Sequence, residues 1–281
     1  MNQTPGERLQ IDWPMFGLTV AVVLAACIPI VGLGPGAAAA ITATYDALTE
    51  RFGILYLWYG IGTLGFLGWL AASRYGRIKL GDADSRPDFS TRSWLAMIFC
   101  AGVGAGLLYW AVIEWGYYIA KPPHGFAPRS PEAIEWAASY GLFHWGPTGW
   151  AILCLPSLPI AYAYYVRKIP YLRLSTGCSA FLPEGVTGVR GRAIDFLYML
   201  NIIGGAGTSL GLSTPMISAA FAEFAGLERN FSLDVAVVVA CIAIYGTSAY
   251  LGLERGFKRM SDATMVLALL LLLFVLIVGP T

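Results

Sequence analysis

Charged residues are scarce in this sequence. Asp, Glu, Lys and Arg make up 12% of its 281 residues, whereas an ordinary soluble domain has about 25%. Hydrophobic residues make up 57%, and the mean hydropathy is +0.64. A water-soluble fold of this length could not bury that much apolar surface, so a lipid bilayer is the expected partner. The net charge of +1 argues against a nucleic-acid partner.

The sequence also lacks the motifs of metal and nucleophilic chemistry. Its five cysteines are scattered without CxxC spacing, and it has two histidines. HExxH, GxSxG and Cys/His clusters are missing, which argues against a membrane protease or metalloenzyme. The sequence therefore predicts a protein that is not an enzyme and has no cofactor.

Long apolar segments are what the sequence has in abundance. A membrane-spanning helix needs roughly 20 mainly apolar residues. Seven segments meet this requirement and predict an all-α membrane protein with seven transmembrane helices. A signal peptide is the alternative for the first segment, although its apolar run exceeds the usual 7 to 15 or so residues. The seven segments are Trp13–Leu33, Phe52–Ser73, Ser93–Tyr118, Trp136–Val166, Ile194–Ala225, Leu233–Leu253 and Ala263–Val278.

The basic residues predict the orientation of these helices, because Lys and Arg are retained on the cytoplasmic side. With the N-terminus inside, the predicted inner segments hold all but four of the 18 Lys and Arg residues. We therefore expect a multi-pass protein of a bacterial-type plasma membrane with a cytoplasmic N-terminus. The four basic residues on the outer side are Arg51, Lys121, Arg129 and Arg229.

A glycine-rich run interrupts the third apolar segment. It reads Gly102, Val103, Gly104, Ala105 and Gly106, and glycine weakens a helix. A broken helix in a membrane exposes backbone groups that can coordinate an ion or a substrate carboxylate. The alternative is that Gly102 and Gly106 form a GxxxG pair for close helix packing. Spacing alone favours packing.

Two tryptophans in the fourth segment are candidates for cation binding. Trp145 and Trp150 flank Gly146, Pro147 and Gly149, which disturb the helix between them and allow both indoles to face one site. Indole faces attract cations, and aromatic cages hold quaternary ammonium groups. The alternative is an aromatic belt at the membrane surface, which the sequence alone favours.

Ionisable residues within the apolar segments are few. Glu114 lies near the outer end of the third segment, His144 near the outer start of the fourth, and Asp195 at the inner start of the fifth. Each fits an interfacial position as well as a relay. The fifth segment also carries a small, weakly polar face from Asn201 to Gly211, which helix packing explains.

Several stretches together resemble the betaine/choline/carnitine transporter family. They occur in family order over roughly residues 90 to 281, and as a set they are more specific than any one motif. The matching stretches are Ala101–Trp110 with Glu114, Phe143–Trp145 with Trp150, Leu174–Ser175, Ile194–Asp195 with Thr208–Leu212, Met260–Leu267 and Val278–Thr281.

The resemblance implies a secondary transporter of LeuT-like architecture, with two leading helices followed by inverted five-helix repeats. Residues 1–92 would hold the cytoplasmic N-terminus and the leading helices, and residues 93–281 the first repeat. Gly102–Gly106 would be the unwound part of the first repeat helix, and Trp145 and Trp150 part of an aromatic box for quaternary ammonium substrates such as betaine, choline or carnitine. This context favours the functional interpretation of both motifs.

The sequence departs from the family pattern in three ways. Leu153 stands where an aromatic Tyr is common, Trp115 where Pro usually follows Glu114, and Ile202 with Ala206 where sodium-coupled members have hydroxyl residues. One sodium site is therefore in doubt. A second would use backbone around Cys100 and Val103, and its other half would come from a helix outside these 281 residues. Sodium thus remains a candidate coupling ion, beside proton coupling and substrate exchange.

The number of spans differs from that of the family, which has twelve. Seven spans correspond to two leading helices and one repeat. We therefore expect the N-terminal part of a truncated or split transporter, which would need a second chain or a homo-oligomer for alternating access. The alternative is a non-transporting membrane component or remnant that requires a partner chain.

Overall fold

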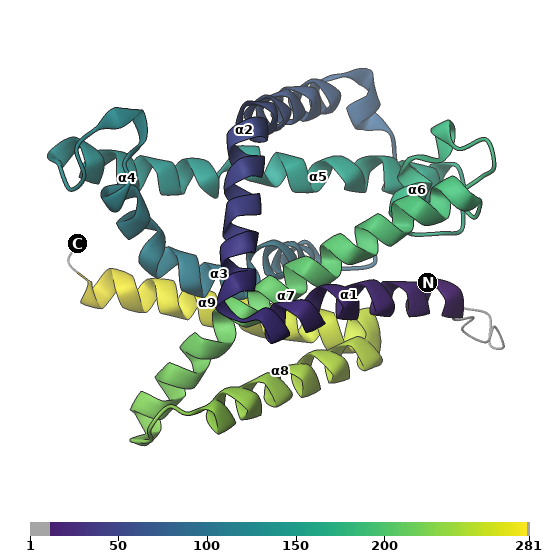
Figure 1. Cartoon of the computed structure of the whole chain (residues 1–281). Helices are drawn as coiled ribbons and strands as arrows, with labels where there is room; N and C mark the ends of the chain where they lie inside the picture. Colours follow the sequence, from purple (N-terminus) through teal and green to yellow (C-terminus); the bar gives the residue numbers. More distant parts are fainter. Residues whose placement is uncertain (1–11, 280–281) are drawn as a thin grey trace. The chain divides into compact units, whose positions relative to one another are not determined.

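A computed structural model describes residues 12–279, apart from the side chains of residues 103–108. All regular secondary structure in this part of the chain is helical (Figure 1). The helices form two compact units, Met1–Asp82 with Gly146–Gly204 and Ala83–Trp145 with Gly205–Thr281. Each unit is described by itself below. The predicted division after residue 92 follows chain order and stays a prediction.

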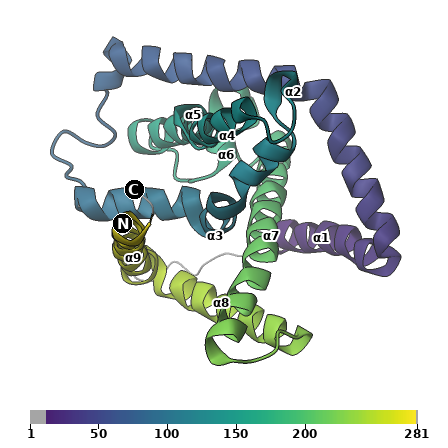
Figure 2. The ribbon, with the colours of Figure 1, turned by 90° about the vertical axis from the view of Figure 1, so that its left-hand side faces the viewer.

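Two long helices open the first unit. Helix α1 (Trp13–Leu33) begins where the Asp12 side chain accepts a hydrogen bond from the Met15 amide at 3.2 Å, as a helix cap does. Gly34 separates it from α2 (Pro35–Ala72) with a φ of +52°, a conformation that favours glycine. Figure 2 shows the resulting corner. The predicted bounds of the first span are confirmed.

Helix α2 begins at Pro35 rather than at Phe52, where the second apolar segment starts. The additional residues include alanines, which are strong helix formers. They also include Thr42 and Thr44, whose hydroxyls donate to the carbonyls of Ala38 and Ala40 at 3.0 and 2.8 Å. Threonine that bonds the preceding turn satisfies its own polar group inside the helix. The prediction missed this part because it followed apolar character alone.

The other elements of the first unit follow α2, and most of them lie after residue 145. Helix α5 contacts both α2 and α6, and a Cβ built on Gly60 of α2 would lie 3.0 Å from the Thr148 methyl group. Glycine therefore lets α5 approach α2 closely. The elements are η1 (Arg74–Arg77), α5 (Pro147–Ala161), the π-turn η3 (Tyr162–Val166), α6 (Leu174–Gly177), η4 (Ser179–Phe181) and the first part of α7 (Val189–Ala225).

Helix α3 (Thr91–Ala120) organises the second unit, because both α4 (Pro131–His144) and α9 (Lys258–Val278) pack against it. The views in Figures 1 and 2 show α9 crossing α3. Ala133 and Ala137 of α4 are buried, and their small side chains allow a close helix contact. The remaining elements are η2 (Pro123–Gly125), the second part of α7, α8 (Phe231–Gly252) and the π-turn η5 (Leu253–Phe257).

Apolar side chains face outward along most of these helices. In α9, for example, the Leu272 side chain is 65% exposed and Ile277 is 72% exposed. Helices that are apolar all round belong in a membrane, so the predicted all-helical membrane fold is confirmed at this level. By length and hydropathy, five stretches of the described residues could cross a bilayer: Trp13–Leu33, Pro35–Ala72, Pro131–Val166, Val189–Ala225 and Phe231–Val278. The count of seven stays a prediction.

Candidate functional site

The fourth predicted span is broken at the tryptophan motif. Helix α4 ends at His144, and the Trp145 amide donates to the Gly141 carbonyl at 3.1 Å. Gly146 is extended, with a ψ of −167°, and α5 begins at Pro147. Proline is tolerated at the first position of a helix and cannot continue the preceding one. The predicted disturbance between the two indoles is therefore confirmed.

A buried carboxylate lies beside this break within the second unit. Glu114 of α3 is only 7% exposed. Its Oε2 accepts a hydrogen bond from the indole Nε1 of Trp145 at 2.6 Å, and its Oε1 lies 2.6 Å from Nδ1 of His144. The Tyr118 hydroxyl donates to the same Oε1 at 3.0 Å. Three donors thus surround one carboxylate, an arrangement that offsets the cost of burying a charge.

Both helices, α3 and α4, contribute side chains to this cluster. Glu114 and Tyr118 are four residues apart on α3, so their side chains share one helix face. His144 and Trp145 lie at the C-terminal end of α4, with ring centroids 5.2 Å apart. The Tyr118 ring contacts Tyr140 of α4 at 5.2 Å. The sequence did not indicate that Glu114 and His144 are paired, because this contact joins positions about 30 residues apart.

The predicted break at the glycine run is not found. Helix α3 continues without interruption from Thr91 to Ala120, and Gly102–Gly106 lies within it. In an apolar surrounding an unpaired backbone group costs several kcal/mol, which exceeds the roughly 1 kcal/mol by which each glycine weakens a helix. Gly102 is half-buried. The side chains of Val103 and Ala105 lie outside the described part of the structure, as does Gly104.

One candidate sodium residue, Cys100, lies where α3 contacts α9. The Cys100 thiol donates to the Ser261 carbonyl at 3.7 Å, and the Ser93 hydroxyl donates to Asp262 Oδ2 at 3.1 Å. Among the described residues, His, Cys, Asp and Glu form no group of three that could hold a metal ion. A sodium site built from the backbone of Cys100 and Val103 stays a prediction.

The two candidate box residues belong to different units. Trp145 ends one segment of the second unit, and Trp150 lies on α5 in the first. Both are half-buried, and their common site stays a prediction. The departures from the family pattern are exposed: Leu153 by 59%, Ile202 by 51%, and Ala206 as well.

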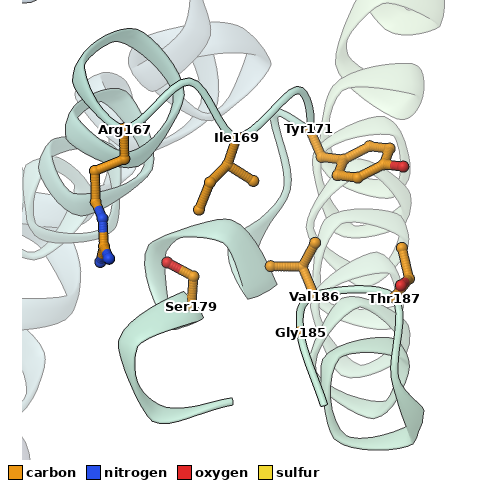
Figure 3. Close-up of a pocket in the computed structure, with 7 residues that line it drawn as sticks. All are labelled: Arg167, Ile169, Tyr171, Ser179, Gly185, Val186 and Thr187. Carbon is orange, nitrogen blue, oxygen red and sulfur yellow. The ribbon is translucent and has the colours of Figure 1, made fainter. Parts of the chain in front are cut away.

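A cavity of about 390 Å³ lies in the first unit, on the loops that join η3 to α7. In Figure 3 the side chains of Ile169 and Val186 point toward one another across it, with Arg167 at one side. None of the residues that line it is a predicted site residue. Its other lining residues are Tyr171, Ser179, Gly185 and Thr187.

Comparison with known proteins assigns the chain to a family. The model described as BCCT, betaine/carnitine/choline family transporter, matches residues 14–281. The chain belongs to this family. The matched family and the relatives below are transporters and not enzymes, as the missing catalytic motifs predicted.

Two curated relatives are similar to this BCCT family member. The uncharacterized transporter YeaV of Escherichia coli strain K12 is 38% identical over 218 residues, which cover 78% of this chain and 45% of the relative. A carnitine transporter of Acinetobacter baumannii is 34% identical over 212 residues, which cover 75% of this chain and 38% of the relative. The matched part therefore spans less than half the length of either relative.

Proposed function

We propose that this BCCT family member, in its full-length form, transports a quaternary ammonium compound across the bacterial plasma membrane by alternating access. The observation that carries the proposal is the break between α4 and α5, where Trp145 projects beside the buried Glu114. An indole held next to a carboxylate suits a cation that cannot donate ordinary hydrogen bonds. The similarity to a carnitine transporter supports the same substrate class.

In this proposal Trp145 and Trp150 bind the trimethylammonium head, and the backbone of Gly102–Gly106 lines the same path. Helix α3 is continuous, so the glycines would act through close approach of the substrate, since they present no side chain. Seven spans, a cytoplasmic N-terminus and the first five-helix repeat of a LeuT-like architecture complete the proposal. The uptake experiment below determines which of betaine, choline and carnitine is transported, and whether transport is coupled to sodium.

Uptake into proteoliposomes tests this function. The full-length protein is reconstituted, and uptake of radiolabelled carnitine, betaine and choline is measured with and without an inward sodium gradient. We expect uptake of at least one of the three. Stimulation by the gradient would support sodium coupling, and equal uptake without sodium would contradict it.

Substitution of the candidate tryptophans tests the box. Trp145→Ala and Trp150→Ala should each weaken equilibrium binding of the transported compound by about tenfold or more, in keeping with the strength of desolvated cation–π contacts. Trp58→Ala is the matched control, because Trp58 lies on α2 and is 67% exposed. Unchanged binding in both box variants would overturn the proposed site.

A further inference from the structure

Trp145 has a hydrogen-bond partner on α3, and no local sequence pattern predicts this contact. Its indole Nε1 donates to Glu114 Oε2 at 2.6 Å, and the Glu114 side chain is 9% exposed. The His144 side chain, which bonds the other carboxylate oxygen, is 57% exposed. The carboxylate is thus buried, whereas the His144 ring lies on the exposed side of the cluster and Trp145 is half-buried.

We infer that Glu114 is a positioning residue that orients the Trp145 indole and strengthens its attraction for a cationic head group. This inference rests on the proposed function. Indole is only a donor, through Nε1, so a fixed acceptor determines the plane in which the ring lies. The two ring faces take no part in this hydrogen bond. The hydrogen bond therefore orients the ring through its edge, whereas a cation is attracted by a ring face.

The charge of Glu114 adds to this effect. A carboxylate that accepts from the indole N–H polarises the ring and makes its face more negative, and this electrostatic effect is larger in a site of low dielectric constant than in water. Cation–π attraction depends on the negative face of the ring. Glu114 is therefore expected to favour cations over neutral molecules of the same shape.

The other contacts of Glu114 keep its carboxylate in place. The Tyr118 hydroxyl and Nδ1 of His144 both bond Oε1, whereas Oε2 accepts from Trp145. Because a carboxylate only accepts hydrogen bonds, the hydrogen in the His144 contact is assigned to Nδ1. With Oε1 held by two donors from two helices, Oε2 presents one defined direction to the indole. The pairing of α3 with α4 thereby determines the ring plane.

The test uses the full-length protein and two ligands that share a shape but differ in charge, choline and its neutral analogue 3,3-dimethyl-1-butanol. Binding of both is measured in wild type, Glu114→Gln, Trp145→Phe and the double variant. Glu114→Gln should raise the Kd for choline by about threefold to tenfold. The Kd for the neutral analogue should change by less than about twofold. A purely structural defect would weaken both ligands equally, and that result would overturn the inference.

The double variant shows whether Glu114 affects choline binding through Trp145 or independently of it. Phe keeps an aromatic face and has no N–H, so Glu114→Gln should change choline binding by less than about twofold in the Trp145→Phe background. Full additivity would overturn the inference. Glu135→Gln serves as the control, because Glu135 is an exposed carboxylate on α4 and should leave both ligands unaffected.

Further outcomes keep the test decisive, and Trp145→Ala is measured beside the other variants. If Glu114→Gln does not fold, the Trp145→Phe variant tests the inference by itself. Loss of the indole N–H should reduce the ratio of affinities for choline and for the neutral analogue. An unchanged preference would overturn the inference. Unchanged choline binding in Trp145→Ala would overturn the proposed site itself. Weaker binding in Trp145→Ala with no effect of Glu114→Gln would overturn the inference alone.

Discussion

Asp195 accepts two hydrogen bonds from Ser175, one from the backbone amide to Oδ1 at 3.0 Å and one from the hydroxyl to Oδ2 at 2.9 Å. Ser175 is fully buried and Asp195 is 8% exposed. The Arg173 guanidinium lies 3.8 Å from the same carboxylate. This contact joins the short helix α6 to the first part of α7, within the first unit.

Replacement of Asp195 should destabilise this junction. Asp195→Ala leaves a buried amide and a buried hydroxyl without their acceptor, which costs about 1 to 3 kcal/mol. We expect a lower thermal unfolding midpoint in detergent and faster hydrogen exchange at residues 174–177. Asp84→Ala is the control, because Asp84 lies exposed in a loop. Equal unfolding midpoints for the two variants would contradict the expected role.

The ion pair between Asp82 and Lys168 should give a local pH response. The Lys168 ammonium donates to Asp82 Oδ1 at 2.8 Å, and this hydrogen bond, with the attraction between the charges, holds the pKa of Asp82 below its ordinary value. A lowered carboxyl pKa contributes stability above the unfolded pKa, and that contribution is lost as the pH falls through the folded pKa.

Substitution of the lysine tests this pH response. In Lys168→Gln the pKa of Asp82 should rise toward its ordinary value, as measured by the carboxyl ¹³C shift of labelled Asp. The difference from wild type should shrink in high salt, because both side chains are exposed and surface pairs are screened. A pKa that stays low in Lys168→Gln would point to another cause.

Packing of α4 against α3 should tolerate little added volume. Ala133 is 0% exposed, so Ala133→Leu forces side chains or backbone to move at a typical cost of about 1 to 3 kcal/mol. We expect a lower unfolding midpoint and weaker choline binding, since the same helix pair holds Trp145. Ile134→Leu changes the neighbouring side chain, which is 55% exposed, and should behave as wild type. An Ala133→Leu variant as stable as wild type would show that the contact is loose.

A tyrosine at position 153 should restore the aromatic residue that the family pattern commonly has there. If Leu153 lies near the bound head group, Leu153→Tyr adds one ring face and should tighten binding of a quaternary ammonium ligand by about twofold to tenfold. Leu153→Phe supplies a ring without a hydroxyl and should give most of the gain. Isothermal titration calorimetry measures both variants, and unchanged affinity in each would place Leu153 away from the ligand.

The sequence predicted a helix end correctly where a capping residue stands at the end of the apolar segment. Helix α1 matches its predicted bounds because Asp12 and Gly34 lie at its two ends. Helix α2 was predicted too short, because the helical residues from Pro35 onward include Thr42 and Thr44, whose hydroxyls bond within the helix. Apolar character alone cannot detect such residues.

The candidate site was predicted in part. The break at Gly146 and Pro147 is a local property, and the sequence reveals it directly. The three-donor environment of Glu114 depends on α4 folding back onto α3, which no local pattern encodes. The unwinding at Gly102–Gly106 was wrong for this structure, since composition shows that glycine weakens a helix but not whether neighbouring interactions keep it intact.

The end of α4 at His144 affects the electrostatic potential around Trp145. The aligned peptide dipoles of a helix leave roughly half a negative elementary charge at its C-terminus, and α4 ends beside the indole of Trp145. The carbonyl groups of the last turn and the Glu114 carboxylate therefore act in the same direction, as an electronegative pole at the C-terminal end of the helix. Such a pole repels solutes that carry only negative charge. Under the proposed function it would therefore disfavour anions beside Trp145.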